Sequence, residues 1–361
     1  MMKFVFFYHS LLSDWNHGNA HFLRGVASEL VNRGHDVKVY EPANGWSLSQ
    51  LRAEHGDAPL IAFARAYPQL SANLYETPDL KTILADADIV LVHEWNEPEL
   101  VARIGSERQR SCRFILLFHD THHRAMTARQ TMESYDLRNY DGVLAYGRSL
   151  TEIYLKAGWT RRAWTWHEAA DIRVFHPTPG AKTLDLIWIG NWGDDERAAE
   201  LREYLIEPVK QLGLKAAVYG VRYPEDVRAA LADAGIEYRG WIANFDVPKA
   251  FATARLTVHV PRRPYIEALP GIPTIRPFEA MACGIPLVSS FWNDAEGLFS
   301  PGKDYLVARN GVEMTKHLCT ILDDAGFAAN LAIQGLKTVR SRHTCAHRVD
   351  ELLEIHAALA R

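Results

Sequence analysis

The first part of the chain alternates between short apolar runs and a helical pattern. Residues 3–8 form an apolar run rich in aromatic side chains, which predicts a strand. Across residues 20–33 the apolar positions recur at helical spacing, and Gly34 follows as a stop signal. Another apolar run at residues 36–40 predicts the next strand. This order predicts the opening unit of a parallel sheet, with the loop over residues 11–19 at its carboxyl edge.

Three further runs extend the predicted sheet, and each is followed directly by polar residues. The apolar runs lie at residues 89–92, 114–118 and 142–145, and the polar residues after them at 93–96, 119–123 and 146–149. Continuously apolar runs are typical of parallel strands covered on both faces. Because the carboxyl ends of parallel strands meet at one edge, we expect these polar residues to gather where open α/β sheets bind ligands.

A stretch rich in proline and glycine at residues 175–180 interrupts the pattern and predicts a linker between domains. The same pattern then begins again. Strands are predicted at residues 184–189, 215–219, 256–260 and 286–289, a turn at 190–193, and helices at 197–212 and about 347–359. The expected fold class is α/β, with two Rossmann-like parallel-sheet domains at residues 1–176 and 177–340 and a closing helical segment at 341–361.

Length and composition agree with this picture and narrow the function. The 361 residues exceed what one ordinary core organises, and 48% hydrophobic and 23% charged residues are typical of a globular protein. A net charge of -4 gives no general attraction to nucleic acid or to an anionic membrane. No apolar stretch is long enough for an integral membrane segment. The four cysteines are scattered, which indicates reduced thiols and a cytoplasmic protein.

The most informative stretch is a loop and helix at residues 270–286. A Pro/Gly loop reaches Glu279 where a helix is predicted to begin, and Gly284 ends that helix. The backbone N–H groups of such a loop and helix start suit a diphosphate. A carboxylate in the first helical turn can accept hydrogen bonds from ribose hydroxyls. The alternative is that Glu279 only caps the helix and complements its dipole.

Residues 277–286 (PFEAMACGIP) resemble the donor-site signature of GT-B glycosyltransferases. The wider set is similar to the spore-maturation CgeB-like, or glycosyltransferase family 4-like, group of that superfamily. The supporting segments are residues 189–193 with Arg197, 238–242 ahead of 246–248, and 343–348. The similarity extends through most of residues 140–361, whereas the first 130 residues match mainly by layout.

The resemblance implies a role for each matching position. It implies that Glu279 holds the nucleotide ribose and that the loop of Thr274, Ile275 and Arg276 lies near the donor phosphates. It also implies that Arg197 faces the diphosphate from the turn at Gly190 and Asn191. A UDP-sugar is the favoured donor, and a GDP- or dTDP-sugar is possible.

One departure from the family pattern concerns stereochemistry. Retaining relatives usually have a second glutamate eight positions before the one that matches Glu279, but this chain has Gly271 there. The nearest acidic residue, Glu267, is displaced in sequence. Retention and inversion of the anomeric configuration therefore both stay open.

No cofactor and no metal is expected. Arg197, Arg276, Arg262 and Arg263 can neutralise a leaving diphosphate, for which a guanidinium group is well shaped. Surface ion pairs are the alternative role for each of these arginines, above all for Arg262 and Arg263.

In the first domain, the loop that holds His17, Gly18 and Asn19 is predicted to line the acceptor side of the cleft. It has neither the GxGxxG pattern of dinucleotide-binding enzymes nor a Walker lysine, so an ordinary turn is the alternative. His93 and Glu94 follow a predicted strand and are expected at the same edge.

His119 and Asp120 also follow an apolar strand, and either could be the base that activates an acceptor hydroxyl. A structural hydrogen-bonding role is the alternative. A metal site made by His119, His122 and His123 with His93 and Glu94 is disfavoured, because no metal-binding spacing supports it.

These features predict a glycosyltransferase that moves a hexosyl or related group from a nucleotide-sugar donor to a hydroxyl of a small-molecule or glycan acceptor in an interdomain cleft. A sugar-nucleotide epimerase on the same fold is one alternative, although no paired acids or bases can be placed around a sugar carbon. A nucleotide-sugar or glycan-binding protein without turnover is another, and Gly271 keeps it open. A nicotinamide oxidoreductase is disfavoured by its missing fingerprint.

Overall fold

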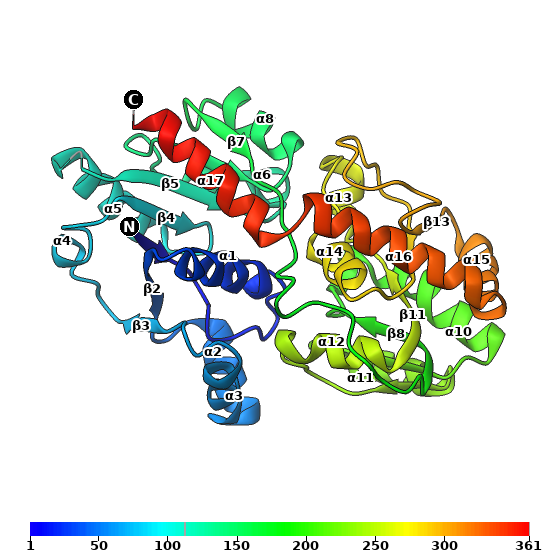
Figure 1. Cartoon of the computed structure of the whole chain (residues 1–361). Helices are drawn as coiled ribbons and strands as arrows, with labels where there is room; N and C mark the ends of the chain where they lie inside the picture. The colour runs from blue at the N-terminus through cyan, green and yellow to red at the C-terminus, as the bar shows by residue number, and fades with distance from the viewer. Residues whose placement is uncertain (112, 361) are drawn as a thin grey trace. The chain divides into compact units, whose positions relative to one another are not determined.

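The computed structural model describes residues 1–111 and 113–360, so Cys112 lies outside the described residues. The chain divides into two compact units (Figure 1). Unit 1 comprises Met1–Glu168 and Cys345–Arg361, and unit 2 comprises Ala169–Thr344. The first boundary therefore lies eight residues before the expected one, and the terminal helix belongs to the compact unit formed by the first part of the chain.

Unit 1 is a seven-stranded parallel sheet with helices around it. In sheet order its strands are β3 (Ala72–Tyr75), β2 (Asp36–Pro42), β1 (Lys3–Phe7), β4 (Ile89–His93), β5 (Ile115–Asp120), β6 (Gly142–Ala145) and β7 (Ala163–Thr165). Its helices are α1 (Ala20–Asn32), α2 (Trp46–His55), α3 (Ala58–Ala66), α4 (Leu80–Ile83), α5 (Pro98–Ser111), α6 (Arg124–Thr127), α7 (Arg129–Glu133), α8 (Arg148–Lys156) and α17 (Cys345–Leu359). The parallel sheet that the sequence predicts is confirmed.

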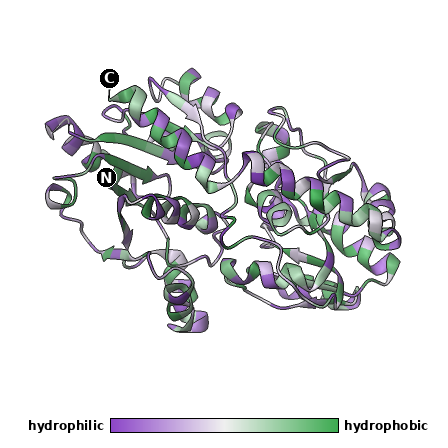
Figure 2. Cartoon of the chain, in the orientation of Figure 1, coloured by the Kyte–Doolittle hydropathy of each residue, from purple (hydrophilic) through white to green (hydrophobic). Residues whose placement is uncertain are grey.

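The central strands β4 and β5 of unit 1 are buried along their length. Figure 2 shows that they are mostly hydrophobic. Strand β5 is longer than predicted, because it includes His119 and Asp120 instead of ending before them. The ladder continues at this end, where His93 is paired with His119 and the Glu94 N–H donates to His119 O at 2.9 Å. The side chains of His93 and His119 are therefore positioned by the sheet and not by a loop.

Helix α17 packs beside α1 in unit 1 (Figure 1). It begins two residues earlier than predicted. The Arg33 guanidinium at the end of α1 pairs with Asp350, and the Trp166 indole N–H donates to Arg348 O at 2.8 Å. These contacts explain why the last helix clusters with the first part of the chain.

Unit 2 has a six-stranded parallel sheet. In sheet order its strands are β10 (Ile236–Tyr238), β9 (Ala216–Tyr219), β8 (Leu184–Ile189), β11 (Ala254–His259), β12 (Leu287–Ser290) and β13 (Leu306–Ala308). Its helices are η1 (Asp194–Glu196), α9 (Ala198–Leu201), η2 (Arg202–Ile206), α10 (Glu207–Leu212), α11 (Glu225–Asp233), η3 (Asn244–Asp246), α12 (Val247–Ala252), α13 (Arg263–Ala268), α14 (Ile275–Ala282), α15 (Gly311–Asp323) and α16 (Ala325–Arg342). The second Rossmann-like sheet is thus confirmed.

Two helix predictions in unit 2 need correction. The helix expected from Arg197 begins at Ala198 and contains the π-helical turn η2 in its middle. The helix expected to start at Glu279 begins at Ile275, so the carboxylate lies in its second turn. Pro277 fits within the first turn of this helix, because proline lacks only an N–H that is unpaired there anyway.

None of the helices in the described residues is both long enough and apolar enough to cross a membrane.

Candidate functional site

Polar side chains from adjacent strands meet at the carboxyl edge of the unit 1 sheet. His93 ends β4 and His119 lies near the end of β5, and the strand register pairs them directly. Their ring centroids are 5.2 Å apart, and both side chains are fully buried. The gathering of polar residues at this edge follows from the parallel register, as the sequence pattern predicts.

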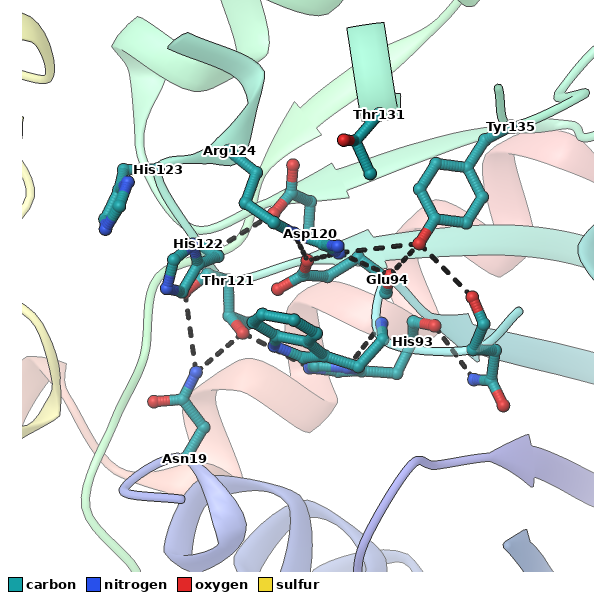
Figure 3. A network of polar contacts seen from close by, with 12 residues as sticks. Asn19, His93, Glu94, Asp120, Thr121, His122, His123, Arg124, Thr131 and Tyr135 are labelled. Atoms are coloured by element: carbon teal, nitrogen blue, oxygen red, sulfur yellow. Dashed lines mark hydrogen bonds and ion pairs between the residues drawn. The ribbon is translucent and has the colours of Figure 1, made fainter. Parts of the chain in front are cut away.

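The loop before α1 is tied to the same edge (Figure 3). The Asn19 side-chain amide donates to Thr121 Oγ1 at 2.6 Å, and that hydroxyl lies 3.2 Å from His93 Nε2. His17 is buried, with its ring 4.0 Å from that of His9. Gly18, which lies between His17 and Asn19 in the sequence, is half-buried. The structure therefore brings His17 and Asn19 near His93, and their acceptor-side role stays a prediction.

Glu94 lies in a buried ion pair (Figure 3). Its carboxylate accepts from Arg124 Nε at 3.1 Å, and its backbone carbonyl accepts from the Tyr135 hydroxyl. The Arg124 guanidinium also lies 3.9 Å from the centroid of the Trp95 ring. Burial and the nearby Asp120 carboxyl raise the pKa of Glu94 to about 8, although Arg124 opposes the rise. One oxygen of Glu94, Oε1, has no partner among the described residues.

The two candidate bases differ in what they contact. Asp120 accepts from the Tyr154 hydroxyl at 2.7 Å and from the His122 N–H at 2.9 Å, so both carboxylate oxygens are engaged. Burial raises the pKa of Asp120 to about 6. Both ring nitrogens of His119 have no hydrogen-bond partner among the described residues, and burial lowers its pKa to about 3. The low pKa of His119 favours the neutral imidazole, and both of its ring nitrogens are buried.

Several residues that complete this edge were missed from the sequence. Of these residues, Arg124 comes nearest to being recognisable from the sequence, because it directly follows the histidines at 122 and 123. Tyr135 and Tyr154 reach the edge from an adjoining segment and from α8, 41 and 34 residues away from their partners. No spacing in the sequence marks such tertiary partners.

A buried ion pair and a buried carboxyl group hold the loop before α1 in place. The Arg24 guanidinium donates to the Asp14 carboxylate at 2.7 Å and to Leu11 O at 2.8 Å. The Glu41 carboxylate accepts from the backbone N–H groups of Leu11 and Leu12. Because the Glu41 side chain is buried, the loop that carries the predicted acceptor residues is anchored by a titratable group.

Glu41→Gln is expected to remove a pH dependence from the stability of unit 1. Burial raises the pKa of Glu41 from 4.5 to about 7, so between these values the folded chain holds a proton that the unfolded chain has released. The contribution of Glu41 to the free energy of unfolding is therefore fully present below pH 4.5 and falls as the pH rises to about 7, by roughly 3 kcal/mol. Urea unfolding at several pH values measures this. An unchanged slope in Glu41→Gln would contradict the assignment.

In unit 2, the loop before α14 has a strained backbone. Thr274 precedes the helix with a φ of 64°, which is unusual for a β-branched residue and costs energy. Ile275 is the first helical residue. Arg276 pairs with Glu279 within the helix, and the Glu279 side chain is fully buried. The carboxylate does not point into bulk solvent, but its observed partner is an arginine one turn earlier.

Arg197 joins the predicted turn to the neighbouring strand. Its guanidinium donates to the backbone carbonyls of Asn191, Trp192 and Val260, the last at 3.1 Å. The carbonyl of Gly190 accepts from the Tyr223 hydroxyl at 2.8 Å. Arg197 therefore fixes the backbone after β8 and β11 in the described structure, a role that its position in the sequence does not indicate.

Three arginines and a histidine share one electrostatic neighbourhood. Burial, followed by the charges of Arg262 and Arg276, lowers the pKa of Arg197 to about 10. Burial and the charges of Arg197 and Arg276 lower the pKa of His259, at the end of β11, to about 3. Arg262 pairs with Glu196 at 2.8 Å and Arg263 with Glu200 at 2.9 Å. Predicted donor residues far apart in the sequence are thus brought together.

No group of three or more histidine, cysteine, aspartate or glutamate side chains in the described part of the chain is arranged to hold a metal ion.

Two family models match, one in each half of the chain. The family described as Glycosyltransferase Family 4 matches residues 17–174, and the family described as glycosyl transferase-like matches residues 197–354. None of the curated proteins matches the chain.

Many solved structures share the fold along the whole chain. Anabaena HepE in complex with UDP and glucose has 16% identity and a TM-score of 0.70, with 99% of this chain and 100% of that chain covered. Sucrose-phosphate synthase from Thermosynechococcus elongatus has 13% identity and a TM-score of 0.67, with 99% of each chain covered. T4 phage BGT in complex with UDP and Mn2+ has 12% identity and a TM-score of 0.61, with 99% of each chain covered. The two family matches and this shared fold together support a glycosyltransferase with a GT-B fold.

Proposed function

We propose that the chain transfers a hexosyl or related group from a nucleoside diphosphate sugar to a hydroxyl of a small molecule or glycan, without a metal. Unit 2 binds the donor and unit 1 binds the acceptor. UDP is the favoured nucleotide, because HepE and BGT were both solved with it. The narrower resemblance to the CgeB-like group is part of this proposal.

The observation that carries the proposal is the joint position of Arg197, Arg276 and Glu279 in unit 2. The charge of Arg276 lowers the pKa of Arg197, and Arg276 forms an ion pair with the Glu279 carboxylate. Guanidinium groups are suited to a diphosphate, and the carboxylate to ribose hydroxyls. A bound nucleotide would share or replace the Arg276 contact, since Glu279 is covered in the free chain.

Thermal unfolding in the presence of UDP, GDP and dTDP, in EDTA and then with Mn2+, tests the donor and the metal together. UDP at a hundredfold excess over its dissociation constant should raise the free energy of unfolding by about 2.7 kcal/mol, with or without EDTA. Failure of all three nucleotides to bind would overturn the proposal. Binding that requires Mn2+ would overturn only its metal-independent part.

Turnover separates the alternatives. Release of UDP from a UDP-sugar, stimulated by an acceptor from a panel of sugars and alcohols, is the expected result. An isomerised sugar without acceptor would indicate an epimerase, and binding without release across the panel would indicate a binding protein.

In unit 1 we assign the substrate contact to His119 and a positioning role to Asp120. The buried ring nitrogens of His119 have no hydrogen-bond partner among the described residues, whereas Asp120 accepts from Tyr154 and from the backbone N–H of His122. His119→Asn should lower kcat by about 100-fold, a typical loss for a group that handles a proton. The dissociation constant for UDP should not change. An unaltered kcat would remove His119 from the reaction.

A further inference from the structure

The side chain of Glu296 occupies the space above Gly271. A Cβ atom built on Gly271 would lie 2.6 Å from Glu296 Oε1 and 2.8 Å from its Cγ. The Gly271 N–H also donates to Asn293 O at 2.7 Å, which joins the two loops. A side chain at position 271 would therefore require Glu296 to adopt another conformation.

The backbone gives a second reason for glycine at this position. The φ of Gly271 is 93°, a conformation that other residues rarely adopt. Glycine at position 271 therefore permits the turn and leaves room for a carboxylate from another loop.

Two other acidic residues near Gly271 in the sequence are placed differently from Glu296. Asp294, in the same loop, accepts from the backbone N–H groups of Leu298 and Phe299, each at 2.9 Å, and so shapes the turn. Glu267 lies on α13 and is exposed. The carboxylate beside Gly271 thus comes from a residue 25 positions later in the sequence.

The location of this carboxylate connects it to the donor site. The loop that starts at Gly271 runs directly into α14, which carries Arg276 and Glu279. A carboxylate next to a bound nucleotide sugar can accept hydrogen bonds from sugar hydroxyls but is repelled by phosphate. Its natural target is therefore the sugar and not the diphosphate.

We propose that Glu296 binds hydroxyls of the donor sugar, and so provides from another loop the carboxylate that the family resemblance places at position 271. This inference rests on the proposed function. It assigns Glu296 to recognition of the transferred sugar and leaves nucleotide binding to Glu279 and the arginines. Gly271 is then not the mark of a lost activity.

Glu296→Gln tests the assignment, with Glu267→Gln as the matched control. Loss of one or two charge-assisted hydrogen bonds should lower kcat/KM for the UDP-sugar by roughly 10- to 100-fold. Affinity for UDP alone should stay within about twofold of wild type, because UDP lacks the sugar. Glu267→Gln should behave as wild type in both assays.

The outcomes separate this inference from the proposal on which it rests. If wild type does not bind UDP, both are overturned. If wild type binds UDP and Glu296→Gln matches Glu267→Gln with the UDP-sugar, only the assignment of Glu296 is overturned. A loss of UDP affinity in Glu296→Gln equal to the loss with the UDP-sugar would also overturn it.

A carboxylate swap provides a gain of function. Glu296→Gly should lose at least as much activity as Glu296→Gln, and adding Gly271→Glu returns an acid to the same space from the first loop. Recovery of several-fold in kcat/KM is expected, and the positive φ at position 271 keeps it partial. A folded double variant no more active than Glu296→Gly would count against a shared position.

Discussion

Glu279→Ala is expected to weaken UDP binding by roughly 100-fold or more. A carboxylate that accepts hydrogen bonds from two ribose hydroxyls contributes about 1.5 to 3 kcal/mol for each, and alanine removes both. The variant also releases Arg276 from its ion pair. Calorimetric titration of wild type and variant with UDP measures the change, at a temperature where both are folded.

The buried ion pair makes a structural role for Glu279 the competing explanation. Arg276→Met separates the two, because it removes the pair but keeps the carboxylate. If Glu279 binds ribose, Glu279→Ala should lose more UDP affinity than Arg276→Met loses through the phosphates. A variant Glu279→Ala that is less stable but binds UDP as wild type would assign the residue to α14 alone.

Arg124→Met is expected to lower the free energy of unfolding of unit 1 by about 3 to 5 kcal/mol. The loss is large above about pH 8, where Glu94 is ionised, because it leaves this carboxylate buried without its ion-pair partner beside a second carboxyl, Asp120. The side chains of Glu94 and Arg124 are 0% and 13% exposed, so water cannot replace the missing charge. Urea unfolding followed by tryptophan fluorescence and circular dichroism measures the loss.

Arg129→Met is the matched control, because Arg129 pairs with Glu133 at the surface and should contribute at most about 1 kcal/mol. The double variant Glu94→Gln/Arg124→Met should be more stable than Arg124→Met, since no charge is left unpaired. Equal losses in Arg124→Met and Arg129→Met would show that the buried pair is not what stabilises this edge.

The strands that the sequence predicted are those in the sheet interiors. Strands β1, β4 and β5 in unit 1 and β8 and β11 in unit 2 are mostly apolar and buried, and were found within two residues of their bounds. The strands with no prediction are β3, β7, β10 and β13, which are the four sheet edges. Edge strands here are three or four residues long and partly exposed, so they lack a sustained apolar run.

The candidate site was predictable where position along a strand or helix decides it. His93, Glu94, His119 and Asp120 were found because they end apolar runs, and parallel strands end at one edge. The start of α14 was wrong by four residues, because a proline is compatible with both a loop and a first helical turn. Roles for these residues stay predictions.

The sequence by itself determined the two α/β units and which polar residues stand at the sheet edges, because strand and helix periodicity are local properties of the chain. Only the tertiary structure decided which side chains share a site. Arg124 reaches Glu94, Tyr154 reaches Asp120, and Glu296 fills the space above Gly271. These partners are separated by 25 to 34 residues and meet only after the sheets form, so no local pattern records them.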